Sequence, residues 1–111
     1  MDKSLKYKKG ILAALAYPLQ GSNSDMPNVK SQLIVDETAG SYVMFMFGWY
    51  KEKYIHTLMF HMEIRAEKVW IYENNTDYPI EEALIESGVD DQDIIFAWDT
   101  PYELESLSIA A

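Results

Sequence analysis

The sequence contains no cysteine, which excludes disulfide bonds, thiolate zinc sites and cysteine nucleophiles. Its 111 residues include a single arginine, Arg65, and only two histidines. The apolar stretch at residues 11–19 is interrupted by Tyr17-Pro18, is too short to span a bilayer and lacks a signal-peptide cleavage site. These absences predict a cytoplasmic protein that does not enter a membrane.

Basic residues are missing from the C-terminal third of the chain. Residues 73–111 hold eleven acids and no base, whereas residues 1–72 hold all nine lysines and arginines and seven acids. Because nucleic-acid affinity comes mainly from neutralised phosphates, DNA should repel this third. The four lysines from Lys3 to Lys9 are typical of a solvated helix face. Direct nucleic-acid binding by the isolated chain is therefore not expected.

The composition is that of a small folded domain. Apolar residues make up 49% of the chain and aromatic residues 14%, which argues against disorder. A chain of this length can bury enough surface to fold unaided. We therefore expect residues 1–111 to form one domain.

Residue patterns predict the secondary structure. Leucines at helical spacing favour a helix over residues 3–16, and Pro18 disfavours helix at Tyr17. Pro79 and Gly88 are typical of the start and end of a second helix. Strands are expected at residues 32–36, 42–49, 54–64, 69–72 and 94–98, with a hairpin turn at residues 65–68. The predicted class is α+β: a twisted, mainly antiparallel β-sheet with an N-terminal helix and a helix before the last strand. The sequence does not decide whether that last strand pairs in parallel or antiparallel.

Alternation along residues 54–64 assigns side chains to faces. The side chains expected to face the core are His56, Leu58, Phe60, Met62 and Ile64. The odd separation of His56 and His61 then puts the two imidazoles on opposite faces, where they cannot share a metal ion. The run Asp90-Asp91-Gln92-Asp93 lacks the glycine and the distal glutamate of a calcium loop. No metal site is expected.

No catalytic constellation is visible. The sequence has no Gly-rich phosphate loop, nucleophile elbow or Walker-type lysine. We therefore expect neither an enzyme nor a cofactor. The alternative is a small-molecule-binding or minor enzymatic domain with a ligand cleft near His61 and Glu63, which share one face of their strand.

Strands that are apolar on both faces indicate self-association. Residues 42–49 read as a strand covered on both faces, and Trp70 lies opposite Val69 and Ile71. Two helices are too few to cover both faces of such a sheet, so we predict a homo-oligomer, most simply a dimer. Side chains expected to contact partners are Trp49, Trp70, Glu81, Glu82, Glu86, Asp99 and Tyr102.

A series of short motifs recurs in a known family. The motifs are Gly48-Trp49, His61-Met62-Glu63-Ile64, Lys68-Val69-Trp70-Ile71 and Asn74-x-Thr76-Asp77, followed by Ile80, Gly88-Val89 and Asp93-Ile94. Their order and spacing resemble the XisI family, the fdxN element excision controlling factors of cyanobacteria. The resemblance runs from about residue 32 to residue 101. It implies an accessory factor in programmed DNA excision, a site-specific recombination during heterocyst differentiation, with a nuclease-like protein, XisH, as partner.

The C-terminus departs from that pattern. Family members typically carry His-Pro-Pro after the final strand and then an arginine, where this chain has Asp99-Thr100-Pro101 and Leu104. A contact made by those basic groups would be lost here or reversed in sign.

Two routes to a controlling role are open. In the first, the acidic residues 73–105 complement a basic surface of a XisH-like protein, since charge complementarity speeds association and selects partners. In the second, the lysines from Lys3 to Lys9 touch DNA with low, salt-sensitive affinity. The charge distribution favours the protein-binding route.

Overall fold

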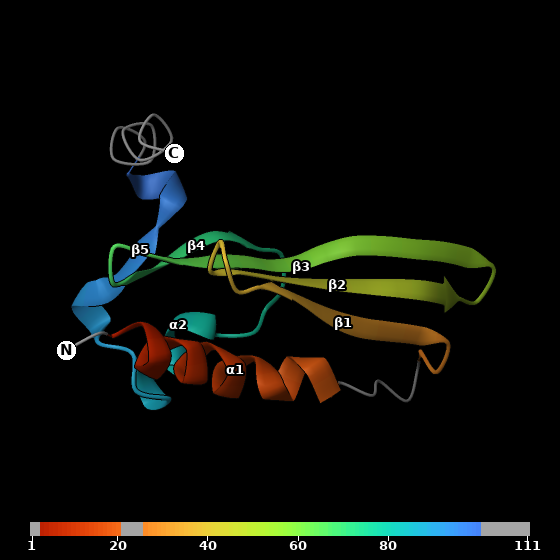
Figure 1. Cartoon of the computed structure of the whole chain (residues 1–111). Helices are drawn as coiled ribbons and strands as arrows, with labels where there is room; N and C mark the ends of the chain where they lie inside the picture. The colour runs from red at the N-terminus through yellow and green to blue at the C-terminus, as the bar shows by residue number, and fades with distance from the viewer. Residues whose placement is uncertain (1–2, 21–25, 101–111) are drawn as a thin grey trace.

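The computed structural model describes residues 3–20 and 26–100, which form a five-stranded sheet with two helices on one face (Figure 1). The elements are α1 (Ser4–Gln20), β1 (Val29–Asp36), β2 (Ser41–Tyr50), β3 (Lys53–Arg65), β4 (Lys68–Asn74), α2 (Ile80–Glu86), β5 (Ile94–Phe96), and the 3₁₀ turns η1 (Asp91–Asp93) and η2 (Ala97–Asp99). The strands lie in sequence order; β1 to β4 are antiparallel, and β5 pairs with β4 in parallel. The α+β class and both helix positions are confirmed. No helix in the described ranges is long and apolar enough to cross a membrane.

Helix α1 is longer than the sequence predicts. It continues through Pro18 to Gln20, so the expected end at residue 16 is wrong. Proline has no backbone N–H to donate to the carbonyl four residues earlier, that of Ala14. The Tyr78 hydroxyl donates to this carbonyl at 3.0 Å, and the Tyr78 ring stacks on Tyr17. A donor from outside the helix therefore replaces the missing N–H.

Two turns follow the sequence chemistry closely. Ala66 and Glu67 join β3 to β4 with φ angles of 53° and 61°, as a two-residue hairpin of the primed type requires. Gly48 has φ 137°, and the Trp49 N–H next to it donates to the Asn28 carbonyl at 3.1 Å. This contact starts β1 at Val29, earlier than predicted.

A β-bulge changes the faces assigned to β3. Met44 pairs with Phe60 and Phe45 pairs with Leu58, so Met59 is an extra residue in β3. The bulge inverts the alternation before residue 59, and His56 packs against Phe45 on the face away from the helices. The prediction that His56 and Leu58 face the core is therefore wrong, and the two histidines lie on the same face.

The core lies between the helices and one face of the sheet. Its fully buried side chains include Tyr7, Ile11 and Leu15 of α1, which meet Met44, Phe60, Met62 and Ile71 of the sheet and Leu84 of α2. Within the described residues, the helices cover only this face. Cover on both faces of β2 was expected, but on the other face Trp49 is 54% exposed.

The chain after β4 differs from prediction only at its boundaries. Pro79 is the N-cap of α2 rather than its first residue. Gly88, at φ 107°, follows the helix as predicted, and the Val89 N–H donates to the Leu84 carbonyl at 3.0 Å. The last strand stops at Phe96, and Trp98 lies in η2.

Candidate partner-binding surfaces

The outer face of α2 presents unpaired carboxylates. Ile80 and Leu84 are buried beneath the helix, which turns Glu82 and Glu86 outward into solvent. Ile85 is 42% exposed beside them. We call Glu81, Glu82, Ile85 and Glu86 the acidic helix surface. No ion pair in the described part of the chain involves its three carboxylates.

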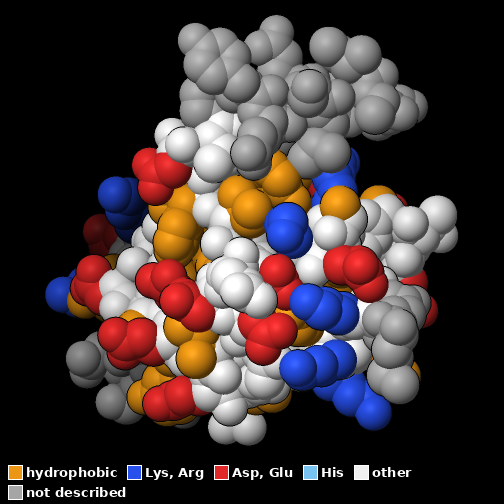
Figure 2. Space-filling view, turned by 90° about the vertical axis from the view of Figure 1, so that its left-hand side faces the viewer, with side chains coloured by type: hydrophobic (Ala, Val, Ile, Leu, Met, Phe, Trp, Pro, Cys, Tyr) orange, Lys and Arg blue, Asp and Glu red, His pale blue; other side chains and the backbone are white. Residues whose placement is uncertain are grey.

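Three of the four lysines from Lys3 to Lys9 lie within ion-pair distance of an acid in the described chain. Lys3 Nζ lies 2.9 Å from Asp93 Oδ2, and Lys8 forms an ion pair with Glu37. Lys6 lies 4.0 Å from Asp90, at the limit for an ion pair. Figure 2 shows acidic side chains spread over this end of the molecule, with lysines gathered at its lower right. Pairing with these acids reduces the charge that α1 can offer to a phosphate backbone.

Asp93 is the centre of a polar cluster that the sequence analysis missed. It is 4% exposed, accepts a hydrogen bond of 2.5 Å from the Tyr7 hydroxyl and lies 3.5 Å from Lys68 Nζ. Hydrogen bonds from Tyr7 and then Lys3 lower the pKa of Asp93 to about 2. Burial, followed by the hydrogen bond to Asp93, raises the pKa of Tyr7 to about 12. These contacts bind the start of α1 to η1 and the chain leading into β5.

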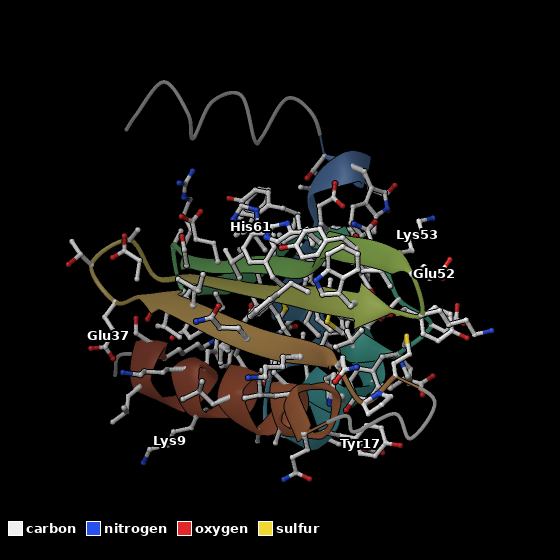
Figure 3. All side chains as sticks on the ribbon, turned by 90° about the vertical axis from the view of Figure 1, so that its right-hand side faces the viewer. Lys9, Tyr17, Glu37, Glu52, Lys53 and His61 are labelled. Atoms are coloured by element: carbon white, nitrogen blue, oxygen red, sulfur yellow. The ribbon has the colours of Figure 1, made fainter. Side chains whose placement is uncertain are left out.

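The sheet face away from the helices carries a continuous group of apolar side chains. We call this the open face and define it by its central residues on β1, β2 and β3: Ile34, Val43, Phe45, Phe47, Trp49, Tyr54, His56, Leu58 and His61. Ile34 is 49% exposed, and Trp49 and Tyr54 are each 54% exposed. Figure 3 shows His61 on the side of the sheet opposite α1. Exposed apolar groups of this kind are typical of interaction surfaces.

Glu63, one of the two residues expected to line a ligand cleft, is tied into a network of its own. It is 8% exposed, and its Oε1 accepts a hydrogen bond of 2.6 Å from the Tyr72 hydroxyl and lies 3.0 Å from the Arg65 guanidinium. Its Oε2 accepts a hydrogen bond from Ser41 at 3.3 Å. The His61 ring lies against Tyr72 at 4.8 Å. Both carboxylate oxygens are thus engaged within the chain, which disfavours a ligand role for Glu63.

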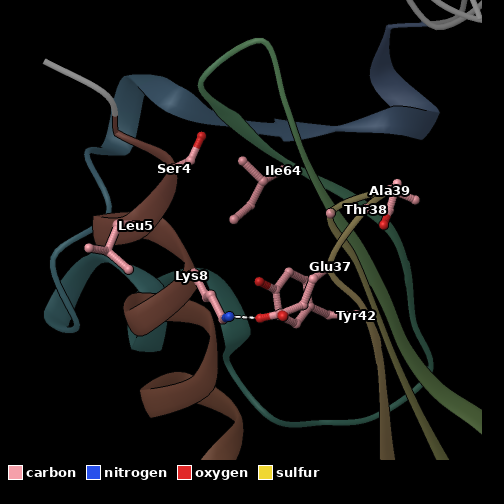
Figure 4. A pocket seen from close by; sticks show the side chains of 9 residues that line it. Ser4, Leu5, Lys8, Glu37, Thr38, Ala39, Tyr42 and Ile64 are labelled. Carbon is pink, nitrogen blue, oxygen red and sulfur yellow. Dashed lines mark ion pairs between the residues drawn. The ribbon is translucent and has the colours of Figure 1, made fainter.

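Two surface hollows lie elsewhere on the molecule, and neither is lined by His61 or Glu63. One, of about 420 Å³, lies between the start of α1 and the β1–β2 turn, and the ion pair of Lys8 with Glu37 bridges it (Figure 4). The other, of about 300 Å³, is lined by Tyr72, Trp98 and residues 73–75. The described residues contain no group of three or more His, Asp or Glu side chains placed to hold a metal ion.

The aromatic residues proposed as contacts have different exposures. Trp49 and Trp98 are more than half exposed, and Asp99 is exposed beside Trp98. Trp70 is 3% exposed and stacks on Tyr72, so a partner does not reach its ring in this structure. Val69 and Ile71 are buried on the opposite face, as the sequence predicts. Tyr102 lies outside the described residues.

Comparison with known proteins assigns the chain to a family. The model of the XisI family, described as XisI protein, matches residues 1–110. This chain belongs to the XisI family. A XisI-like protein from Anabaena variabilis ATCC 29413 is 30% identical with a TM-score of 0.76, covering 91% of this chain and 92% of that one. The fdxN element excision controlling factor XisI from the same organism is 28% identical with a TM-score of 0.66, covering 90% of both chains. No curated protein matches the sequence.

The motifs that resembled the XisI family build the fold rather than a catalytic site. Gly48-Trp49 starts the pairing of β1 with β2. In Asn74-x-Thr76-Asp77, the Asn74 side chain accepts hydrogen bonds from the Thr76 N–H at 2.9 Å and hydroxyl at 2.8 Å. Thr76 Oγ1 in turn accepts from the Tyr78 N–H at 3.0 Å. This turn leads into α2 and places Tyr78 against α1.

Proposed function

We propose that this XisI-family chain is a non-enzymatic controlling factor in the programmed excision of a DNA element, and that it acts in the cytoplasm through protein partners. The family membership supports the role, because a structural neighbour at 28% identity is an fdxN element excision controlling factor. The two buried carboxylates of the described chain, Asp93 and Glu63, are engaged in internal networks, which supports a non-enzymatic role.

The acidic helix surface is the observation that carries the protein-binding route. Its carboxylates are unpaired within the described chain, while the lysines that might touch DNA are largely paired. A basic partner surface would complement it, and Ile85 supplies an apolar contact at its centre. We propose a XisH-like protein as that partner, and we propose that the chain binds it as a homo-oligomer.

Charge reversal on α2 tests this proposal. Glu82→Lys with Glu86→Lys changes two exposed carboxylates, one in the first turn and one in the last. Their opposite effects on the helix dipole largely offset each other, so α2 should persist. We expect the association rate with a purified XisH-like protein to fall at least tenfold at low salt, measured by surface plasmon resonance.

A matched control reverses the same charge elsewhere. Glu52 and Glu67 are exposed at the β2–β3 and β3–β4 turns, outside α2. Glu52→Lys with Glu67→Lys should leave binding close to that of the wild type. Equal binding by the α2 variant and the wild type would contradict the proposal, as would an equal loss in both variants.

A further inference from the structure

We infer that the open face is the contact between two copies of this chain, packed sheet on sheet. This inference rests on the proposed self-association and names the surface that produces it. The occupant would be a second open face related by a two-fold axis, so that each patch meets its own equivalent.

The exposure of the open face requires a covering layer. Aliphatic and aromatic side chains on three adjacent strands face away from the core, and three of them are about half exposed. In Figure 1, η2 rises above the sheet only at the end near β4 and β5, and the described chain leaves β1 to β3 uncovered on this side. Strand spacing and rise put the face at roughly 20 Å by roughly 25 Å with its side chains. Two such faces would bury about 1,000 Å² in total, which is the lower limit for a specific interface.

The charge of the open face favours contact with a second copy of this chain over contact with a basic protein. The chain has a net charge of −9, so two copies repel each other wherever their acids meet. On β1 to β3, the rows from Ile34 to Trp49 hold one charged side chain, Lys30, which pairs with Phe47 at the β1 edge. On β4, the exposed Glu73 pairs with His61 at the end of one of these rows. Glu63, beyond these rows, is already paired with Arg65. Two copies can therefore meet on the rows of β1 to β3 without burying an unpaired acid there, whereas a basic protein finds no carboxylate on those rows to recognise.

Sheet geometry makes the arrangement feasible. Two twisted sheets pack face to face with their strands about 30° apart and about 10 Å between layers. The aromatic side chains of β2 and β3 would fill that layer, with Phe45 and Leu58 at its centre. The helices would then lie on the two outer sides. Each acidic helix surface would stay free, so one dimer could hold two partner molecules.

The test compares two neighbouring residues that point to opposite faces. His56 and Thr57 are both exposed in β3, but His56 packs on Phe45 of the open face while Thr57 pairs with Met46 on the other side. Each is changed to glutamate in the full-length chain, and the mass in solution is followed by sedimentation equilibrium from micromolar to millimolar concentration. Circular dichroism confirms that both variants fold.

We expect a dimer for the wild type and for Thr57→Glu. For His56→Glu, the dissociation constant of the dimer should be at least a hundredfold higher. A dimer that survives His56→Glu would overturn the open-face contact, while the proposed self-association would stand on another surface. Equal weakening by both substitutions would also overturn it, since the effect would then come from the strand rather than from the face. A wild type that stays monomeric at millimolar concentration would overturn both proposals.

Discussion

The Tyr78 hydroxyl donates a hydrogen bond to the Ala14 carbonyl at 3.0 Å, across 64 residues of sequence. Ala14 is 2% exposed and lies four residues before Pro18, inside α1. The proline ring cannot supply the N–H that this carbonyl would accept in an uninterrupted helix. The side chain that follows the Asn74-x-Thr76-Asp77 turn therefore completes a helix at the other end of the chain.

Tyr78→Phe should destabilise the fold, because it removes the hydroxyl that donates to the Ala14 carbonyl. The phenyl ring keeps the stacking on Tyr17, but the buried carbonyl loses its partner, which costs roughly 1–2 kcal/mol. Urea unfolding measures the loss. Pro18→Ala restores a backbone donor, so the double variant should lose less stability than the two single variants added together. Strict additivity would show that Tyr78 and Pro18 are not coupled. Tyr17→Phe, at a residue 73% exposed, is the control and should be near neutral.

Gly48→Ala should be among the more damaging small substitutions. A Cβ at Gly48 would lie 2.1 Å from the Asn28 carbonyl oxygen, and φ is 137°. Backbone strain and the clash together should cost about 3 kcal/mol and separate the start of β1 from β2. Gly88→Ala is the matched control, because φ is 107° but the nearest atom, Lys6 Cε, lies 3.8 Å away. Its cost should be about 1 kcal/mol. Thermal unfolding ranks the two, and a Gly88 variant as unstable as the Gly48 variant would contradict the steric argument.

Asp93 should make the fold sensitive to acid. Its pKa is about 2 in the folded chain against an ordinary 3.8, so on acidification the unfolded chain takes up this proton first. The stabilisation is therefore full above about pH 4 and is lost as pH falls toward about 2. Asp93→Asn should flatten this part of the pH dependence and cost roughly 1–3 kcal/mol at neutral pH. Asp91→Asn, at an exposed neighbour, should leave the acid slope unchanged; a wild-type slope in the Asp93 variant would refute the assignment.

Tyr7 and Tyr72 should be late to ionise among the eight tyrosines. The pKa of each is raised to about 12, first by burial and then by a hydrogen bond to Asp93 and Glu63, respectively. Because the neutral form is favoured in the folded chain, their stabilisation is complete below about pH 10 and is lost as pH rises through about 12. An ultraviolet absorbance titration should show a late step that shrinks in Tyr72→Phe.

Local chemistry explains which parts of the fold could be predicted. The Ala66-Glu67 turn, the glycine after α2 and the alternation within β4 depend on residues a few positions apart, and each was placed correctly. The faces of β3 before residue 59 could not be placed, because an extra residue in a strand leaves no mark in the hydrophobic pattern. That one residue moved His56 to the open face and, with it, the surface we assign to a second copy.

The candidate surfaces also contain some features that could be predicted from the sequence and some that could not. Helical spacing and the absence of nearby bases were enough to predict that the outer face of α2 carries Glu81, Glu82 and Glu86. The pairing of Lys3 and Lys8 could not be foreseen, since their acids lie far away in sequence. Trp70 was expected at a contact, but it is 3% exposed and stacks on Tyr72.

By itself, the sequence determined the class of fold, the helix and strand order, the uneven charge and the family, because these depend on local propensity, composition and short motifs. Only the tertiary structure decided that β5 runs parallel to β4, that α1 passes Pro18, and which lysines remain free. Each of these depends on a partner that chain folding brings from a distant position, and local patterns carry no record of that partner. The open face belongs to the second group: its residues were visible, but only the bulge and the one-sided helices showed that they lie together and uncovered.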